Sequence, residues 1–150
     1  CIRDRIYSAV KTPFEIRSGL EKVTRRFFKI CNNGRESFTG LYKSLTEQGI
    51  CKGHQCIAYG LYMRDNGIEL SEGLAVYGYS ICSAIVTNCV KLVPLSQLAG
   101  QKILGESFAL ISSASEKALF TDINDIGISG AGFDLRAMQH EQLYSRQYMS

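Results

Sequence analysis

The stretch TPFEIRSGLEKVTRRFFKI, residues 12–30, is the clearest helical segment of this 150-residue chain. It opens with a helix start signal in which Thr12 is the N-cap, Pro13 takes the first helical position and Glu15 completes a capping box. Behind this start, apolar residues recur at alternating steps of four and three, the pattern of a helix packed on one face. They are Ile16, Leu20, Val23, Phe27 and Ile30. Asn33-Gly34 then ends the helix.

The same periodicity predicts further helices over residues 37–48, 54–65, 71–92, 96–120 and 133–145, with a kink near Gly105. Ser71 and Ser96 are the expected N-caps, and Pro94 forces a break between two long helices. The side chains expected to face inward are Phe38, Leu41, Leu45, Ile57, Ala58, Leu61, Leu74, Tyr77, Ile81, Ile85 and Cys89. No strand alternation and no fixed-period repeat is present. The sequence therefore predicts an all-α fold, a bundle of six to seven helices in one domain spanning residues 1–150.

Composition excludes several classes of protein. Hydrophobic residues make up 45% and charged residues 21% of the chain, which is typical of a soluble globular protein. A net charge of +3 without a Lys/Arg-rich run argues against nucleic-acid binding. The longest apolar stretch, residues 77–94, is interrupted by polar side chains and predicts a buried helix rather than a membrane span. The chain opens at Cys1, inside what reads as a helix, so we interpret it as an N-terminally truncated fragment.

The six cysteines do not follow the spacing of a disulfide framework and are expected to be reduced, as in a cytoplasmic protein. Cys51, His54 and Cys56 form the only cluster with metal-ligand residue types. A tetrahedral structural site needs four ligands, and His140 is the only other histidine, so a helix entry is the favoured interpretation. A metal-binding chaperone or a small enzyme that uses this cluster stays open as the alternative.

No motif for catalysis is present. Residues 128–132 read ISGAG, which lacks the Lys-Ser/Thr pair of a phosphate-binding loop, and no nucleophile stands in a recognisable context. We therefore expect no enzymatic activity. The C-terminal stretch, MQHEQLYSRQYMS at residues 138–150, is unusually rich in Tyr, Met and Arg for a chain end, and these types are common at interface hot spots.

Two segments carry a resemblance to a known family. CVKLVPLSQLAGQKIL (residues 89–104) and the terminal MQHEQLYSRQYMS resemble the two strongest signatures of the urease accessory protein UreF family. TPFEIRSGLEKVTRRFFK (residues 12–29) is similar to the family's helix with an E-x-R pair followed by a basic run. GHQCIAYGLYMRDNGIEL (residues 53–70) is similar to its helix that starts at a histidine.

The resemblance implies an all-α homodimer without catalytic activity that bridges two partners in nickel delivery to apo-urease. One partner is the scaffold protein UreD, also called UreH, and the other is the nickel-carrying GTPase UreG. Nickel passes through the complex, and the chain itself holds no cofactor. The resemblance further implies a cytoplasmic protein, with no membrane among its partners. The alternative of a plain structural helical domain predicts that the tail is dispensable.

The resemblance also implies site residues. It assigns the C-terminal tail to partner binding, through His140, Glu141, Tyr144, Ser145, Arg146 and Tyr148. The corner between the two long helices is a structural or GTPase-facing element, with Lys91, Pro94, Gln97, Gly100 and Gln101. Tyr77 and Tyr79 lie where the family places self-association. Within the tail we expect Arg146 to be the pivot, because its guanidinium carries five donors in fixed geometry and bridges several carbonyls at once.

Overall fold

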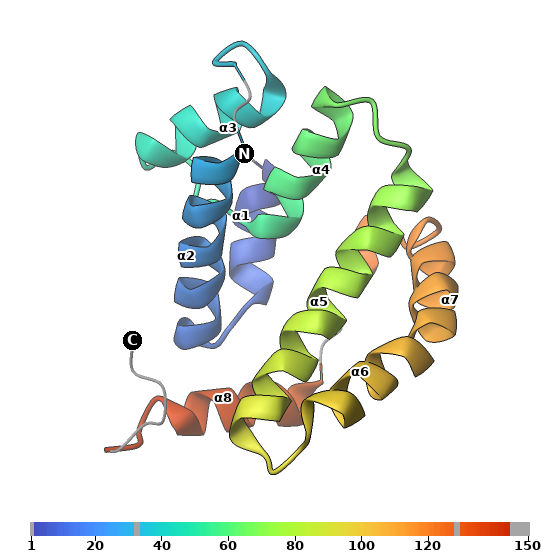
Figure 1. The fold of residues 1–150 in the computed structure, drawn as a ribbon. Coiled ribbons are helices and arrows are strands. Elements are labelled where there is room, and N and C mark those ends of the chain that lie inside the picture. Colours follow the sequence, from blue (N-terminus) through green and yellow to red (C-terminus); the bar gives the residue numbers. More distant parts are fainter. Residues whose placement is uncertain (1, 32–33, 128–129, 145–150) are drawn as a thin grey trace. The chain divides into compact units, whose positions relative to one another are not determined.

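The computed structural model describes residues 2–31, 34–127 and 130–144, and within these ranges the regular structure is helical, without strands (Figure 1). The predicted all-α class is confirmed. This part of the chain contains eight α-helices and one 3₁₀ turn, so the expected count of six to seven is slightly low.

The chain divides into two compact units, each described here by itself. Unit 1 comprises residues 1–66 and 123–150, and unit 2 comprises residues 67–122. Unit 1 contains α1 (Ile2–Val10), α2 (Phe14–Ile30), α3 (Phe38–Glu47), α4 (Gln55–Asp65), the turn Ile123–Asp125 and α8 (Ala131–His140). Unit 2 contains α5 (Leu70–Leu92), α6 (Gln97–Glu106) and α7 (Phe108–Ala118). The prediction of a single domain stays a prediction.

In unit 1, α4 packs against both α2 and α3, and α8 packs against α2. The core is built on Phe28, Tyr42, Cys51 and Ala58, with the Phe28 and Tyr42 rings edge to face at 5.9 Å between centroids. In unit 2, α5 packs along α6 and α7 (Figure 1).

Several residues that were predicted to end or start a helix do so in the structure. Gly49 and Gly67 take the left-handed conformation with φ of 75° and 64°, and they follow the ends of α3 and α4. Ser96 caps α6 by accepting a hydrogen bond from the backbone N–H of Ala99 at 3.1 Å. The expected kink near Gly105 is a break at Ser107, between α6 and α7.

Other helix ends differ from expectation. Helix α2 has Pro13 rather than Thr12 as its N-cap, and the Pro13 side chain forms no capping hydrogen bond. Helix α5 is capped by Glu69, whose carboxylate accepts from the Ser71 N–H, rather than by Ser71. The last helix begins at Ala131 and ends at His140, because the chain turns at residues 141–142.

Several side chains that were expected to face the core lie at the surface instead. Val23, Ile30, Phe38 and Leu41 are exposed, and Ile30 retains 81% of its accessible surface. Thr24 is buried instead, because its hydroxyl is satisfied by donating to the Leu20 carbonyl at 2.9 Å. A buried hydroxyl with a partner carries little penalty, so α2 can turn this small residue inward.

The prediction that the apolar stretch ending near Pro94 is a buried helix is also wrong. Only Gly73 of α5 is buried, and Ile81 and Ile85 are exposed. Among the described residues, α5 is the one helix long and apolar enough to cross a membrane by length and composition, with a mean hydropathy of 1.4. A single helix of this kind is weak evidence for a span, and only 6% of its most apolar window is buried within the chain.

Candidate interaction surfaces

The cluster of Cys51, His54 and Cys56 is part of the packed interior of unit 1. His54 is fully buried, its Nε2 lies 2.6 Å from the Ser8 hydroxyl, and its ring packs against Tyr7 at 4.7 Å between centroids. Burial raises the pKa of both thiols, which disfavours the thiolate that binds metal. Across the described ranges, no group of three metal-ligating side chains is placed to hold an ion.

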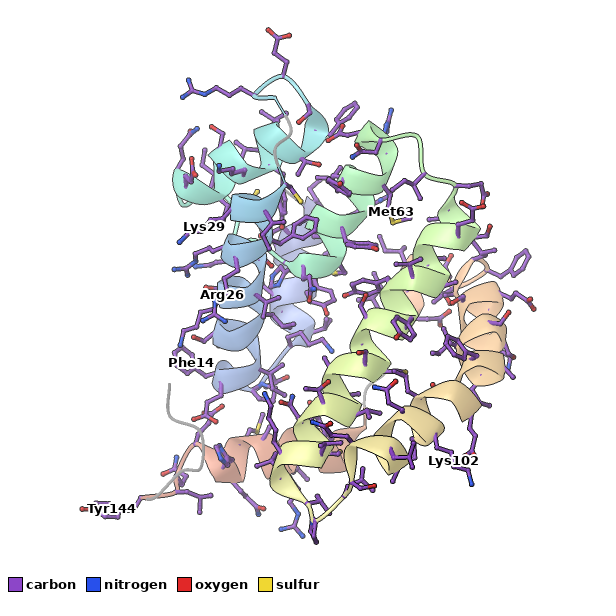
Figure 2. All side chains as sticks on the ribbon, in the orientation of Figure 1. Phe14, Arg26, Lys29, Met63, Lys102 and Tyr144 are labelled. Carbon is purple, nitrogen blue, oxygen red and sulfur yellow. The ribbon has the colours of Figure 1, made fainter. Side chains whose placement is uncertain are left out.

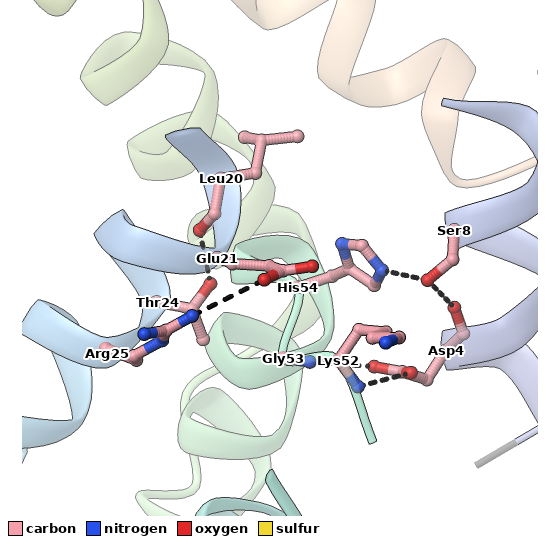
Figure 3. A network of polar contacts seen from close by, with 9 residues as sticks. All are labelled: Asp4, Ser8, Leu20, Glu21, Thr24, Arg25, Lys52, Gly53 and His54. Atoms are coloured by element: carbon pink, nitrogen blue, oxygen red, sulfur yellow. Dashed lines mark hydrogen bonds and ion pairs between the residues drawn. The ribbon is translucent and has the colours of Figure 1, made fainter. Parts of the chain in front are cut away.

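The residue that organises this interior is Asp4, which no pattern in the sequence singled out. Its carboxylate is only 2% exposed and accepts three hydrogen bonds. One donor is the Tyr42 hydroxyl at 2.6 Å. The others are the Lys52 N–H at 2.8 Å and the Gly53 N–H at 3.1 Å (Figure 3). Asp4 thus ties α1 to α3 and to the turn before α4.

The pKa values in this network follow from burial and hydrogen bonding. Burial alone raises the pKa of Asp4, but hydrogen bonds from Lys52, Tyr42 and Gly53, with a smaller effect of His54, bring the pKa below its usual value. Burial lowers the pKa of His54, which favours the neutral imidazole. Burial and the bond to Asp4 raise the pKa of the Tyr42 phenol. The network therefore favours an ionised carboxylate at Asp4 and a neutral imidazole at His54.

The corner between α5 and α6 contains two structural residues. Pro94 lies two residues after the end of α5, and Gly100 is buried where α6 meets α5. A Cβ at Gly100 would lie 2.8 Å from Val90 Cγ2 and 3.2 Å from Val86 Cγ1, so only glycine permits this approach. By contrast, the side chains of Lys91, Gln97 and Gln101 are exposed and available to a partner.

An apolar groove of about 510 Å³ lies between α5 and α7. Tyr77, Ile81, Leu110 and Ile111 line it, and Leu110 is 73% exposed. Tyr79, on another side of α5, stacks on Phe108 with ring planes 1° apart and centroids 5.6 Å apart. The structure therefore places Tyr77 in the groove and Tyr79 in an aromatic pair beside it. Phe108 and Leu110 were missed, although their spacing within an apolar helix was visible in the sequence.

His140 and Glu141 contact α2 within unit 1. His140 Nδ1 lies 2.7 Å from Glu15 Oε2, and the Glu15 N–H donates to Glu141 Oε1 at 3.2 Å. Glu141 therefore supplies an acceptor at the start of α2, where the N-cap residue Pro13 forms no side-chain capping bond. Arg17 holds the preceding turn by donating to the Lys11 and Thr12 carbonyls at 3.1 and 3.2 Å.

The remaining tail residues are only partly described. The Tyr144 side chain is fully exposed beyond the end of α8 (Figure 2). Ser145, Arg146 and Tyr148 lie outside the described residues, as does Cys1. The five described cysteines, Cys31, Cys51, Cys56, Cys82 and Cys89, are free thiols, as expected.

Comparison with known proteins gives consistent matches. The family model described as UreF matches residues 3–107. The urease accessory protein UreF of Actinobacillus pleuropneumoniae serotype 3 is 33% identical over 148 residues, 98% of this chain and 65% of that protein. UreF of Streptococcus thermophilus is 34% identical over 109 residues, 73% of this chain and 46% of that protein. UreF of Paenarthrobacter aurescens is 29% identical over 151 residues, 98% of this chain and 66% of that protein. The chain thus spans about half to two thirds of the length of these relatives.

Proposed function

Because this chain belongs to the UreF family, we propose that it is a non-catalytic adaptor in urease maturation. In this role it bridges the scaffold protein UreD, or UreH, and the nickel-carrying GTPase UreG, so that nickel enters apo-urease through the complex. Nickel is the cargo of that complex rather than a cofactor of this chain. The protein works in the cytoplasm as a homodimer and modulates the GTPase.

The observation that carries this proposal is the apolar face of unit 2. An adaptor without chemistry of its own needs surface that gains stability from partners, and contiguous exposed apolar surface marks such sites. Helix α5 presents Val76, Ile81 and Ile85 to solvent, and the groove it forms with α7 is lined almost entirely by apolar side chains. A second copy of the chain is the occupant that fits the family's self-association near Tyr77.

Two exposed aliphatic side chains give a matched test. Leu110→Asp places a charge in the α5–α7 groove, whereas Ile30→Asp places the same charge at an exposed position in unit 1. Leu110→Asp is expected to abolish self-association in size-exclusion chromatography and capture of the scaffold and GTPase from a co-expression lysate. Ile30→Asp is expected to leave both unchanged. Normal capture by Leu110→Asp would refute the role of this face.

The alternative of a metal-binding chaperone that uses Cys51, His54 and Cys56 has less support. It requires the thiols of Cys51 and Cys56 to ionise, although burial raises the pKa of both. Calorimetry with nickel decides between the two: a sub-micromolar site in the isolated chain, lost in a Cys51→Ala/Cys56→Ala variant, would favour the alternative.

A further inference from the structure

A second hollow lies in unit 1, between α2, α3 and the turn that leads into α4. Its volume is about 610 Å³, within the roughly 300–1,000 Å³ of ligand pockets. Its charged lining consists of Arg25, Lys29, Lys43, Lys52, Glu21 and Glu47. We call this hollow the basic groove. It shares no residue with the tail, the corner or the α5–α7 groove.

Its charges are unbalanced. Four basic and two acidic side chains give the lining a net charge of +2, against +3 for the whole chain. Arg25 pairs with Glu21 at 3.4 Å. Within the ranges that the structure describes, Lys29, Lys43 and Lys52 have no ion pair. Three ammonium groups therefore converge on the groove with only Glu47 left to oppose them.

The groove is built on a fixed turn. Gly49 and Gly53 both have positive φ, 75° and 85°, and they bracket the segment that carries Lys52. The buried Asp4 carboxylate holds this segment through the Lys52 and Gly53 N–H groups (Figure 3). A Cβ at Gly53 would lie 2.8 Å from Thr46 Cγ2, so the turn sits directly on α3. A binding surface fixed before the partner arrives loses less entropy on association.

We propose that the basic groove binds an acidic segment of a partner protein, whose Asp and Glu carboxylates meet Lys29, Lys43 and Lys52. Complementary charge across an interface speeds association and fixes register. A nucleic-acid strand fits less well, because single-strand sites offer aromatic faces for base stacking, and the groove's one aromatic side chain, Phe28, is buried. The proposal does not depend on the assignment to urease maturation.

Helix α2 offers a matched control. Lys22 and Arg26 are exposed on the same helix as Lys29 but do not line the groove; Figure 2 labels Arg26 and Lys29. Lys29→Gln/Lys43→Gln and Lys22→Gln/Arg26→Gln remove the same net charge from the chain. The probe is a fluorescein-labelled oligoglutamate peptide, followed by fluorescence anisotropy at low and at physiological salt.

The groove variant is expected to bind the peptide about tenfold more weakly or worse, because it loses two of the three lysines that would pair with the peptide's carboxylates. The control variant is expected to stay within about twofold, since dispersed charge is largely screened. Equal loss in the two variants, or no binding by the wild type, would overturn the proposal. So would tighter binding of a single-stranded DNA of equal charge that is lost in the groove variant.

Cross-linking maps the site without any variant. A carbodiimide joins a lysine to a carboxylate in direct contact with it. In the wild-type protein, cross-links to the oligoglutamate peptide should concentrate at Lys29, Lys43 and Lys52. Cross-links spread evenly over these and over Lys22 and Lys102 would mean that the peptide has no defined site, and the proposal would be wrong.

Discussion

In unit 1 a carboxylate, Asp4, is almost fully buried, whereas in unit 2 the apolar side chains of α5 lie mostly at the surface. The buried charge of unit 1 is satisfied by three donors from two other segments, so the unit's shape is fixed from within. Unit 2 buries few of its apolar side chains: Leu104 and Ile111 are the large ones. The contrast supports the proposal that a partner covers unit 2, whereas unit 1 is held together by its own buried network.

The largest expected effect comes from removing the centre of unit 1. Asp4→Ala leaves the Tyr42 hydroxyl and the N–H groups of Lys52 and Gly53 without their acceptor, and each unsatisfied donor costs about 1–3 kcal/mol. We expect the free energy of unfolding to fall by about 3 kcal/mol or more in urea denaturation. Glu36→Ala, at an exposed position in the same unit, is the control and should change stability by less than about 0.5 kcal/mol. A small loss in Asp4→Ala would show that water replaces the carboxylate readily.

The next effect tests how unit 2 is assembled. Gly100→Ala brings a methyl group within 2.8 Å of Val90 Cγ2, and overpacking of this kind costs about 1–3 kcal/mol. Gly105→Ala, also in α6, meets nothing within 4 Å and should stabilise the protein by about 0.5–1 kcal/mol through helix propensity. Thermal denaturation should therefore show shifts of opposite sign. Shifts of the same sign would mean that α6 does not approach α5 as closely as the structure has it.

The sequence predicts features that depend on residues near one another in the chain better than features that depend on contacts between distant segments. Ser96, Gly49 and Pro94 act on their own turns, so the ends that they set were predicted correctly. The buried face of a helix depends on its neighbours, and α2 turns Thr24 inward because of the turn at Gly53, which the stripe of apolar residues cannot reveal.

The candidate surfaces also depend on contacts between distant segments, which the sequence does not reveal. The aromatic and apolar composition of the α5 stretch was evident in the sequence, but the exposure of Ile81 and Ile85 was not. Asp4, Lys43 and Lys52 come from separate segments, and only the fold brings them around one turn. Their roles were therefore missed, while Tyr77, Pro94 and Gly100 were singled out beforehand from a contiguous stretch.

A third effect depends on pH. The pKa of His54 is lowered from 6.5 by burial, so the unfolded state binds a proton more readily than the folded state. The stability that neutral His54 contributes is therefore fully present above pH 6.5 and falls as the pH drops below it, by up to about 1.4 kcal/mol per pH unit. His54→Gln should flatten this slope in denaturation between pH 7 and pH 5. An unchanged slope in His54→Gln would contradict the assignment of this pH dependence to His54.

The smallest effect concerns the contact between α8 and α2, where His140 and Glu141 were expected to bind a partner directly. Glu141 Oε1 accepts from the Glu15 N–H at the start of α2, a position where side-chain acceptors contribute about 0.5–2 kcal/mol. Because this bond is partly exposed, we expect Glu141→Ala to lower stability by only about 0.5–1 kcal/mol. Glu141→Gln keeps the acceptor oxygen and should retain most of that stability. If the contact orients the tail, Glu141→Ala should weaken partner capture and Glu141→Gln should restore it. Equal loss of capture in both variants, at unchanged stability, would mean that the Glu141 charge meets the partner itself and that its bond to α2 is incidental.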